Sequence, residues 1–213
     1  MARKRIRNSK NIKIPRIVIV ISLSFIALLT AIIIAVQPSS SERFFKSYES
    51  AGANSGVNAA ERFTRSNNFK QLNHLDNHGL FSMNQGLINK IKNEDLVIVF
   101  FANPNNETSV SSIAHVNFQF TQSALDEVTN TIYHFTTESY LDDNTPNNNL
   151  RNIITRWTDE FSIIYDLQPK TYSIPLLIAF YEGEFVQATT PGNSISAAIA
   201  KSFYNSVHSK ITK

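Results

Sequence analysis

Residues 172–186 decide the fold, and they read Tyr-Ser-Ile-Pro-Leu-Leu-Ile-Ala-Phe-Tyr-Glu-Gly-Glu-Phe-Val. After Pro175 comes an unbroken apolar and aromatic run, residues 176–181. A run of this kind is typical of a strand that is covered on both faces. The Glu182-Gly183 pair then predicts a tight turn into a further strand, residues 185–189. The stretch therefore predicts a β-hairpin whose first strand opens with a proline.

The sequence before this hairpin alternates between strand-like and helix-like patterns. Residues 96–101 form a second continuous apolar run, bounded by Asn103-Pro104, and residues 131–135 are predicted to form a short strand. Residues 59–92 are expected to be mainly helical or irregular. Apolar positions spaced as on one helix face predict three helices, at residues 109–128, 150–164 and 195–211, the last with Ser194 as its N-cap. The order strand, helix, strand, helix, strand, strand, helix predicts an α/β domain with a mixed sheet.

This order, with an X-Pro pair opening the third strand, resembles the thioredoxin fold. Over residues 80–213 the sequence is similar to the thioredoxin-like bacteriocin accessory proteins of Gram-positive bacteria. The segments that carry the resemblance are residues 95–104, 130–136 and 172–186. The resemblance implies a mixed sheet with flanking helices and a cis bond before Pro175. It also implies that the backbone at Ile174 faces the active loop and pairs with extended peptides. Alternatively, Pro175 only starts a strand, where proline is tolerated.

The resemblance places a Cys-x-x-Cys pair on Asn106 and Ser109, yet the chain contains no cysteine. Dithiol–disulfide exchange needs one thiolate to attack and a second thiol to resolve the mixed disulfide, so this chain cannot perform it. The fold would then keep a peptide-binding surface without its chemistry. We predict binding residues at Asn106, Ser109, Ile174 and Pro175, with no catalytic residue, no metal and no cofactor.

The N-terminal part has the pattern of a membrane anchor. Residues 1–16 carry seven basic residues and no acid, whereas the remainder of the chain has a net charge of −4. The 20-residue run from Ile17 to Val36 has only three polar members and matches the thickness of a bilayer core. A cleaved signal peptide is the alternative, but its apolar region is usually shorter, about 7–15 residues. The basic flank predicts a cytoplasmic tail and an outward-facing C-terminal part in the cell membrane.

The segment after the anchor, residues 37–58, is rich in Ser, Ala and Gly and is predicted to be a stalk below a domain at residues 59–213. Phe44, Phe45 and Tyr48 in that segment suit either an interfacial helix against the lipid or packing under the domain. Because the basic residues gather in a tail and not on a domain, the sequence argues against nucleic-acid binding.

Three further candidates have ordinary structural interpretations. His74 and His78 have the spacing of helical metal ligands but lack a recognisable third ligand, so exposed histidines are favoured. His134 within a strand favours a hydrogen-bonded core residue over a base. Ser109 at a helix start favours an N-cap over a reactive hydroxyl.

The predicted function is that of a membrane-anchored, non-redox thioredoxin-like accessory protein that binds a peptide or protein outside the membrane, linked to bacteriocin or peptide export or immunity. One alternative is a structural subunit of a secretion or conjugation complex, some of which have nuclear-transport-factor-like antiparallel sheets. Another is a non-thiol transferase that uses Ser109.

Overall fold

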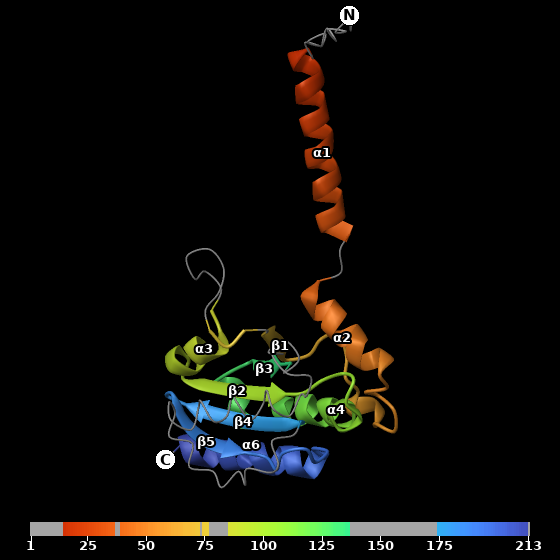
Figure 1. Ribbon diagram of the computed structural model, residues 1–213. Helices are drawn as coiled ribbons and strands as arrows, with labels where there is room; N and C mark the ends of the chain where they lie inside the picture. The colour runs from red at the N-terminus through yellow and green to blue at the C-terminus, as the bar shows by residue number, and fades with distance from the viewer. Residues whose placement is uncertain (1–14, 37–38, 73, 77–84, 137–173, 213) are drawn as a thin grey trace, which may run out of the picture. The chain divides into compact units, whose positions relative to one another are not determined.

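The computed structural model describes residues 15–36, 39–72, 74–76, 85–136 and 174–212, and the chain divides into two compact units (Figure 1). The first unit, Met1–Ser39, contains helix α1 (Arg16–Val36). The second, Ser40–Lys213, contains every described strand. Among the described residues, no helix combines the length and apolar character needed to cross a membrane. The anchor at residues 17–36 therefore stays a prediction from the sequence.

The second unit is built on a five-stranded mixed sheet with the strand order β1-β3-β2-β4-β5. β1, β3 and β2 run parallel, whereas β4 is antiparallel to β2 and β5 is antiparallel to β4. The strands are β1 (Phe69–Leu72), β2 (Leu96–Phe101), β3 (Ile132–Phe135), β4 (Leu176–Tyr181) and β5 (Glu184–Ala188). This arrangement confirms the predicted α/β class with a mixed sheet.

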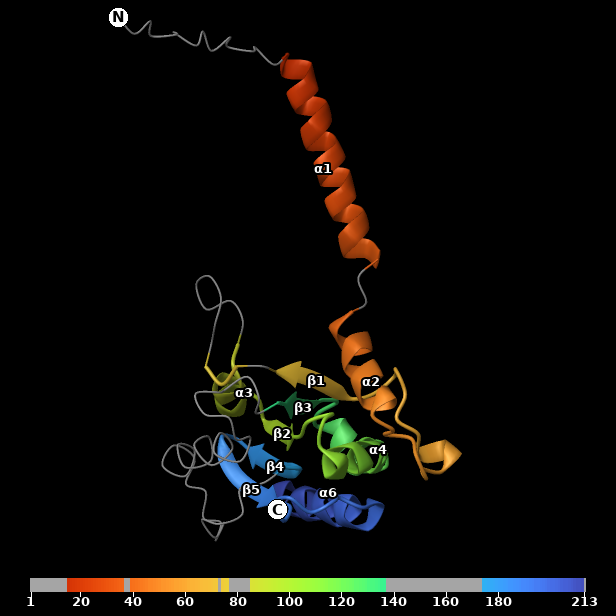
Figure 2. The same cartoon turned by 45° about the vertical axis from the view of Figure 1, so that its right-hand side comes forward.

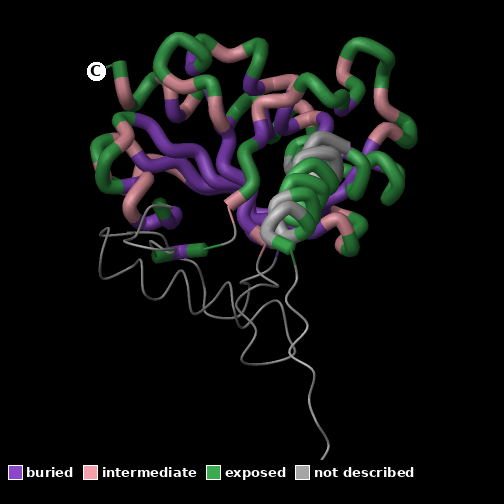
Figure 3. Tube along the Cα trace, turned by 90° about the horizontal axis from the view of Figure 1, so that it is seen from above, coloured by how far each residue is buried: buried purple, intermediate pink, exposed green. Residues whose placement is uncertain are grey.

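Helices cover both faces of the sheet, so the central strands are buried (Figure 3). One face packs against α2 (Ser40–Ser50), α4 (Glu107–Thr121) and α6 (Ala197–Ile211). The other face packs against α3 (Leu87–Asn93), whose three apolar side chains are buried. All six residues of β2 are buried, which explains why its sequence is continuously apolar instead of alternating.

Helix α2 belongs to the domain, although its residues fall in the predicted stalk at 37–58. It lies beside edge strand β1 (Figure 2), and Phe44, Phe45 and Tyr48 are all buried. Phe44 contacts the rings of Phe63 and Phe69, with centroids 6.0 and 5.7 Å apart. In the structure these aromatic side chains pack under the domain, which is one of the two arrangements that the sequence allowed. The compact unit therefore begins at Ser40, upstream of the predicted start at residue 59.

Most predicted elements are confirmed within two residues, and the exceptions have local causes. β1 was missed, because a four-residue edge strand with the sequence Phe-Lys-Gln-Leu gives little periodic signal. Helix α4 ends at Thr121, and its expected continuation is a 3₁₀ turn, η3 (Ala124–Glu127). Gln122 is the C-cap, and the hydroxyl of the next residue, Ser123, donates to the Phe120 carbonyl at 2.7 Å. The predicted helix at 150–164 lies outside the described residues.

The hairpin between β4 and β5 is confirmed at its turn. Glu182 and Gly183 both have positive φ, 50° and 83°, which defines the two-residue turn that matches the twist of paired strands. The glycine is required here by its backbone conformation, since an added Cβ would meet nothing closer than 3.8 Å.

Candidate functional site

The predicted binding residues gather at the carboxyl end of the parallel strands. Phe101, the last residue of β2, pairs with Phe135 at the end of β3 and with Leu176 at the start of β4. The loop after Phe101, which leads into α4, and the Ile174-Pro175 pair before Leu176 therefore lie at the same end of the sheet. The pairing register thus brings Asn106, Ser109, Ile174 and Pro175 to one end of the domain.

The bond between Ile174 and Pro175 is cis, as the resemblance implied. Ile174 is only 6% exposed, and Pro175 is buried. The Pro175 carbonyl accepts a hydrogen bond from Gly192 N–H at 3.0 Å, which ties it to the loop after β5. No hydrogen bond joins the Ile174 backbone to any other described residue. An unpaired backbone next to a strand is the feature that an extended peptide uses when it pairs with a sheet.

Asn106 organises the first turn of α4, which also contains Ser109. Its Oδ1 accepts hydrogen bonds from Ser109 N–H and Ser109 Oγ, both at 2.8 Å, and from Thr108 Oγ1 at 2.7 Å. Asn106 is thus the N-cap of α4, and Ser109 is the third residue of the helix. We call Asn106, Thr108 and Ser109 the carboxyl-end cluster.

The geometry of Ser109 bears on the possibility of a reactive hydroxyl. Its side chain is fully buried, and its hydroxyl donates to an amide oxygen instead of to a base. A nucleophilic serine needs a base within hydrogen-bond reach and an open approach. Ser109 therefore has the surroundings of a structural residue and not those of a nucleophile. The expectation that it caps the helix is wrong in detail, since Asn106 supplies the cap.

The loops around this end are fixed by further hydrogen bonds that the sequence did not reveal. Ser112, fully buried on α4, accepts from Ile195 N–H at 2.8 Å. The Thr189 hydroxyl accepts from Leu177 N–H at 3.0 Å. The N-cap of α6 is Ser196 instead of the predicted Ser194, whose hydroxyl lies 2.9 Å from that of Ser111. Isolated serines and threonines carry no pattern, so only the fold identifies these contacts.

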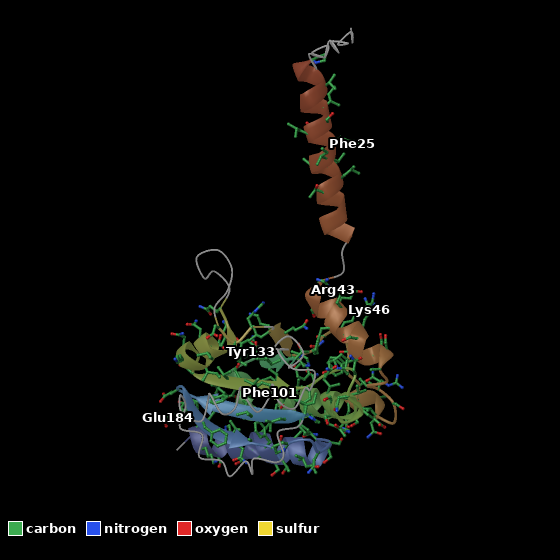
Figure 4. All side chains as sticks on the ribbon, viewed as in Figure 1. Phe25, Arg43, Lys46, Phe101, Tyr133 and Glu184 are labelled. Atoms are coloured by element: carbon green, nitrogen blue, oxygen red, sulfur yellow. The ribbon has the colours of Figure 1, made fainter. Side chains whose placement is uncertain are left out.

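The opposite, amino end of the parallel strands has a second polar cluster that sequence analysis did not identify. Tyr133 donates to Glu94, with its hydroxyl 2.7 Å from Oε2 and 2.8 Å from Oε1. Lys90 Nζ lies 2.7 Å from Glu94 Oε1. We call these three residues the amino-end cluster. They line a polar groove of about 630 Å³. Tyr133 belongs to strand β3 of the sheet (Figure 4).

The environment of Tyr133 disfavours ionisation of its phenol. Burial is the largest cause, followed by the hydrogen bond to Glu94 and by the charge of that carboxylate. All three raise the pKa of Tyr133 well above its usual value. The phenol is therefore a hydrogen-bond donor that joins α3 to β3, and it is unsuited to act as a base.

The histidines are accounted for in different ways. His134 is fully buried, and its Nε2 lies 2.7 Å from the Tyr48 hydroxyl, as expected for a core residue. Burial lowers the pKa of His134 to about 3, so the ring is neutral at physiological pH. His74 is described, but His78 lies outside the described residues. Within the described ranges no group of three potential metal-ligating side chains occurs.

No protein-family model matches the sequence, and no curated protein matches it. One solved structure that it resembles is described as "a putative oxidoreductase with a thioredoxin fold". That likeness has 14% sequence identity and a TM-score of 0.33, and it covers 62% of this chain and 93% of the other.

The fold is decided by the sheet itself. Three parallel strands are followed by an antiparallel hairpin, in the order β1-β3-β2-β4-β5, with a cis proline at the start of β4. The chain has a thioredoxin-like fold. Asn106 and Ser109 lie at the start of α4, after the end of β2. None of the comparisons bears on the closer resemblance to bacteriocin accessory proteins.

Proposed function

We propose that the chain is a membrane-anchored binding protein whose thioredoxin-like domain holds an extended segment of a partner polypeptide without reacting with it. One observation carries the proposal. Asn106 and Ser109, to which the resemblance assigns the two thiol positions, are hydrogen-bonded to each other. They lie at the same end of the sheet as the cis bond before Pro175, where the Ile174 backbone has no hydrogen-bond partner among the described residues. Backbone pairing of this kind gives affinity that depends little on the partner's sequence.

The anchoring part of the proposal is supported by the sequence. Residues 17–36 carry no charge and follow a tail with seven basic residues. This pattern favours a tail in the cytoplasm and a domain outside the cell membrane. The resemblance to bacteriocin accessory proteins supports a role in bacteriocin or peptide export or immunity, with a secreted peptide or an export component as the partner.

The two alternatives receive less support. A nuclear-transport-factor-like scaffold would need an antiparallel sheet, whereas β1, β3 and β2 are parallel. A transferase that uses Ser109 would need an accessible hydroxyl, whereas this one is buried and bonded to Asn106. The binding proposal needs no reactive hydroxyl, and it is supported by the exposed positions Asn105 and Glu107 that flank Asn106.

Photo-crosslinking tests the binding surface directly. Because the chain has no cysteine, a single Asn105→Cys substitution allows a photoreactive group to be attached at an exposed loop position beside Asn106. Ser209→Cys on the exposed side of α6 is the control position. The probe is a library of unstructured peptides of 10 to 15 residues. We expect crosslinks from position 105 and not from position 209.

A pair of charge-reversal variants sharpens the test. Glu107→Arg adds bulk and charge at the first residue of α4, whereas Glu127→Arg makes the same change at the amino end of the sheet; both residues are exposed. We expect Glu107→Arg to lower peptide capture at least fivefold and Glu127→Arg to leave it unchanged. Equal capture by both variants, or crosslinks at position 209 alone, would remove the proposed surface.

A further inference from the structure

Helices α4 and α6 lie side by side on one face of the sheet (Figure 2), and a pocket of about 340 Å³ opens between them. Two buried contacts hold the helices together beside this pocket. The Tyr204 hydroxyl donates to the Val116 carbonyl at 3.0 Å, and the rings of Tyr204 and Phe120 meet edge to face with their centroids 5.6 Å apart. Because the buried Tyr204 also lines the pocket, the pocket has a rigid floor.

Three amide side chains line this pocket. Gln119 and Gln122 come from the C-terminal end of α4, three residues apart and so on one side of the helix, and Asn205 comes from α6. No other described residue forms a hydrogen bond with any of these three side-chain amides. Each amide has two donor hydrogens and an acceptor oxygen. The pocket thus presents donors and acceptors that the domain itself does not use.

One half-buried aromatic ring lies among these amides. Phe118 of α4 lines the pocket, and no other aromatic ring of the described residues contacts it. The face of an aromatic ring carries partial negative charge and attracts polarised C–H groups, such as those on the face of a sugar ring. The hydroxyls of a sugar project around its edge, where they need donors and acceptors. A ring with amides around it therefore suits a ligand that is apolar on one face and hydroxyl-rich at its edge.

The charges around the pocket favour a neutral ligand. Among the described residues that line it, only Lys201 of α6 is charged. The pocket lies at the C-terminal end of α4, where backbone carbonyls lack helical partners and carry partial negative charge. A phosphate or carboxylate would gain one charge-assisted contact, to Lys201, against this field. A neutral ligand avoids the conflict, and the Lys201 ammonium can donate to its hydroxyls.

We propose that the pocket between α4 and α6 binds a neutral saccharide, with a sugar ring against Phe118 and its hydroxyls bonded to the three amides. The pocket volume lies at the lower end of the range for small-molecule sites, about 300–1,000 Å³, and suits one or two sugar rings. Such sites are usually lined mainly by apolar groups, whereas the amides here favour a hydroxyl-rich ligand over a hydrophobic one. Helix α4 has 15 residues, so the pocket lies about 20 Å along it from the carboxyl-end cluster, and the inference does not rest on the proposed function.

Saturation-transfer difference NMR on the full chain tests the inference. The chain is kept in dodecylphosphocholine micelles, because a glycoside detergent would itself offer a sugar. The probes are maltose, cellobiose and the β-1,4-linked disaccharide of N-acetylglucosamine, with glucose 6-phosphate as the anionic comparison. We expect at least one disaccharide to receive saturation at its ring hydrogens, and glucose 6-phosphate to receive at least threefold less. No signal from any disaccharide, or the strongest signal from glucose 6-phosphate, would overturn the inference.

Two double variants that each remove two amides locate the binding. Gln119→Ala/Gln122→Ala should lower the disaccharide signal at least fivefold, whereas Gln71→Ala/Asn193→Ala, at exposed positions on β1 and after β5, should leave it unchanged. Phe118→Leu keeps an apolar side chain without the aromatic face and should lower the signal at least threefold. Far-UV circular dichroism checks that each variant is folded. Equal signals from the two double variants would refute this location. A loss of peptide crosslinking in Gln119→Ala/Gln122→Ala, with no disaccharide signal in the parent, would make the pocket a peptide site instead.

Discussion

The carboxyl-end and amino-end clusters lie at opposite ends of the same strand, β2, and are built from different chemistry. Asn106, Thr108 and Ser109 are neutral, and Ser109 is completely buried. Lys90 and Glu94 are charged, and their side chains are 17% and 33% exposed. Neutral groups that are buried depend on each other, because a lost partner leaves a desolvated atom. Charges near the surface return to water at small cost.

This difference indicates which polar contacts contribute most to the stability of the domain. The carboxyl end has a closed set of hydrogen bonds around Asn106 Oδ1, which fixes the first turn of α4. The other end is a solvated groove, whose ion pair is replaceable. The unfolding free energy should therefore fall strongly when Asn106, the acceptor of the buried Ser109 hydroxyl, is lost, and little when the ion pair between Lys90 and Glu94 is lost.

The largest expected effect is a gain of chemistry at the carboxyl end. The double variant Asn106→Cys/Ser109→Cys should form a reversible disulfide and exchange it with glutathione, an activity that the cysteine-free chain lacks entirely. A helix N-terminus lowers a thiol pKa and favours the reactive thiolate. Thiol titration against pH and exchange with glutathione measure the two properties.

The matched control is Gln119→Cys/Gln122→Cys, which has the same spacing at the other end of α4. There the helix dipole disfavours a thiolate, so we expect no lowering of the thiol pKa. If the two pairs titrate and exchange alike, the carboxyl end lacks the geometry assigned to it.

The next effect is a loss of stability. Asn106→Ala removes the acceptor of three hydrogen bonds and leaves the buried Ser109 hydroxyl unpaired, which should cost about 2–3 kcal/mol of unfolding free energy. Urea unfolding measures this loss. Asn106→Asp keeps the capping oxygen and should stay within about 1 kcal/mol of the parent. Asn105→Ala, at an exposed neighbour, should change little; an equal loss there would contradict the role of Asn106.

A third effect extends the comparison to a buried titratable group. His134 has a folded-state pKa of about 3, below its ordinary value of 6.5. The unfolded state therefore binds more protons between these values, so the stabilisation is complete above pH 6.5 and is lost as pH falls toward 3. Between pH 7 and pH 5 the loss should be about 2 kcal/mol.

Urea unfolding of the parent and of His134→Phe at both pH values isolates this contribution. Between pH 7 and pH 5 the unfolding free energy of His134→Phe should fall by about 2 kcal/mol less than that of the parent, whatever the stability of the variant at pH 7. Identical changes in both proteins would show that His134 stays neutral in the unfolded state as well or gains a proton while folded.

The sequence predicted the central part of the fold well, because continuous apolar runs report burial on both faces. β2 and β4 have the predicted bounds, and the Glu182-Gly183 turn has the predicted geometry. β1 escaped prediction because a short edge strand needs few apolar residues. Helix α2 was assigned to a stalk because its Ser and charged residues obscure the spacing of three aromatic side chains, whose burial depends on a strand that had itself been missed.

The candidate site was predictable only through the resemblance. The resemblance assigned the two positions of the Cys-x-x-Cys pair to Asn106 and Ser109. In the structure these two side chains are hydrogen-bonded to each other. The contacts of Ser112, Thr189 and Tyr133 were out of reach, because their partners lie 12 to 83 residues away in the sequence and depend on the packing of whole elements.

The smallest expected effect comes from the amino end and completes the comparison. Lys90→Met removes the ion pair with Glu94 but keeps an unbranched apolar side chain in place, so it should cost no more than about 0.5 kcal/mol in 0.1 M salt. Tyr133→Phe is the informative partner variant, because it removes a hydrogen bond to a carboxylate from a side chain that is only 3% exposed, and it should cost about 1.5–3 kcal/mol. Urea unfolding of both variants tests the order of the two effects. A loss above 2 kcal/mol for Lys90→Met would mean that the amino-end charges are as tightly coupled as the buried cluster at the other end of β2, and the contrast between the two ends would no longer hold.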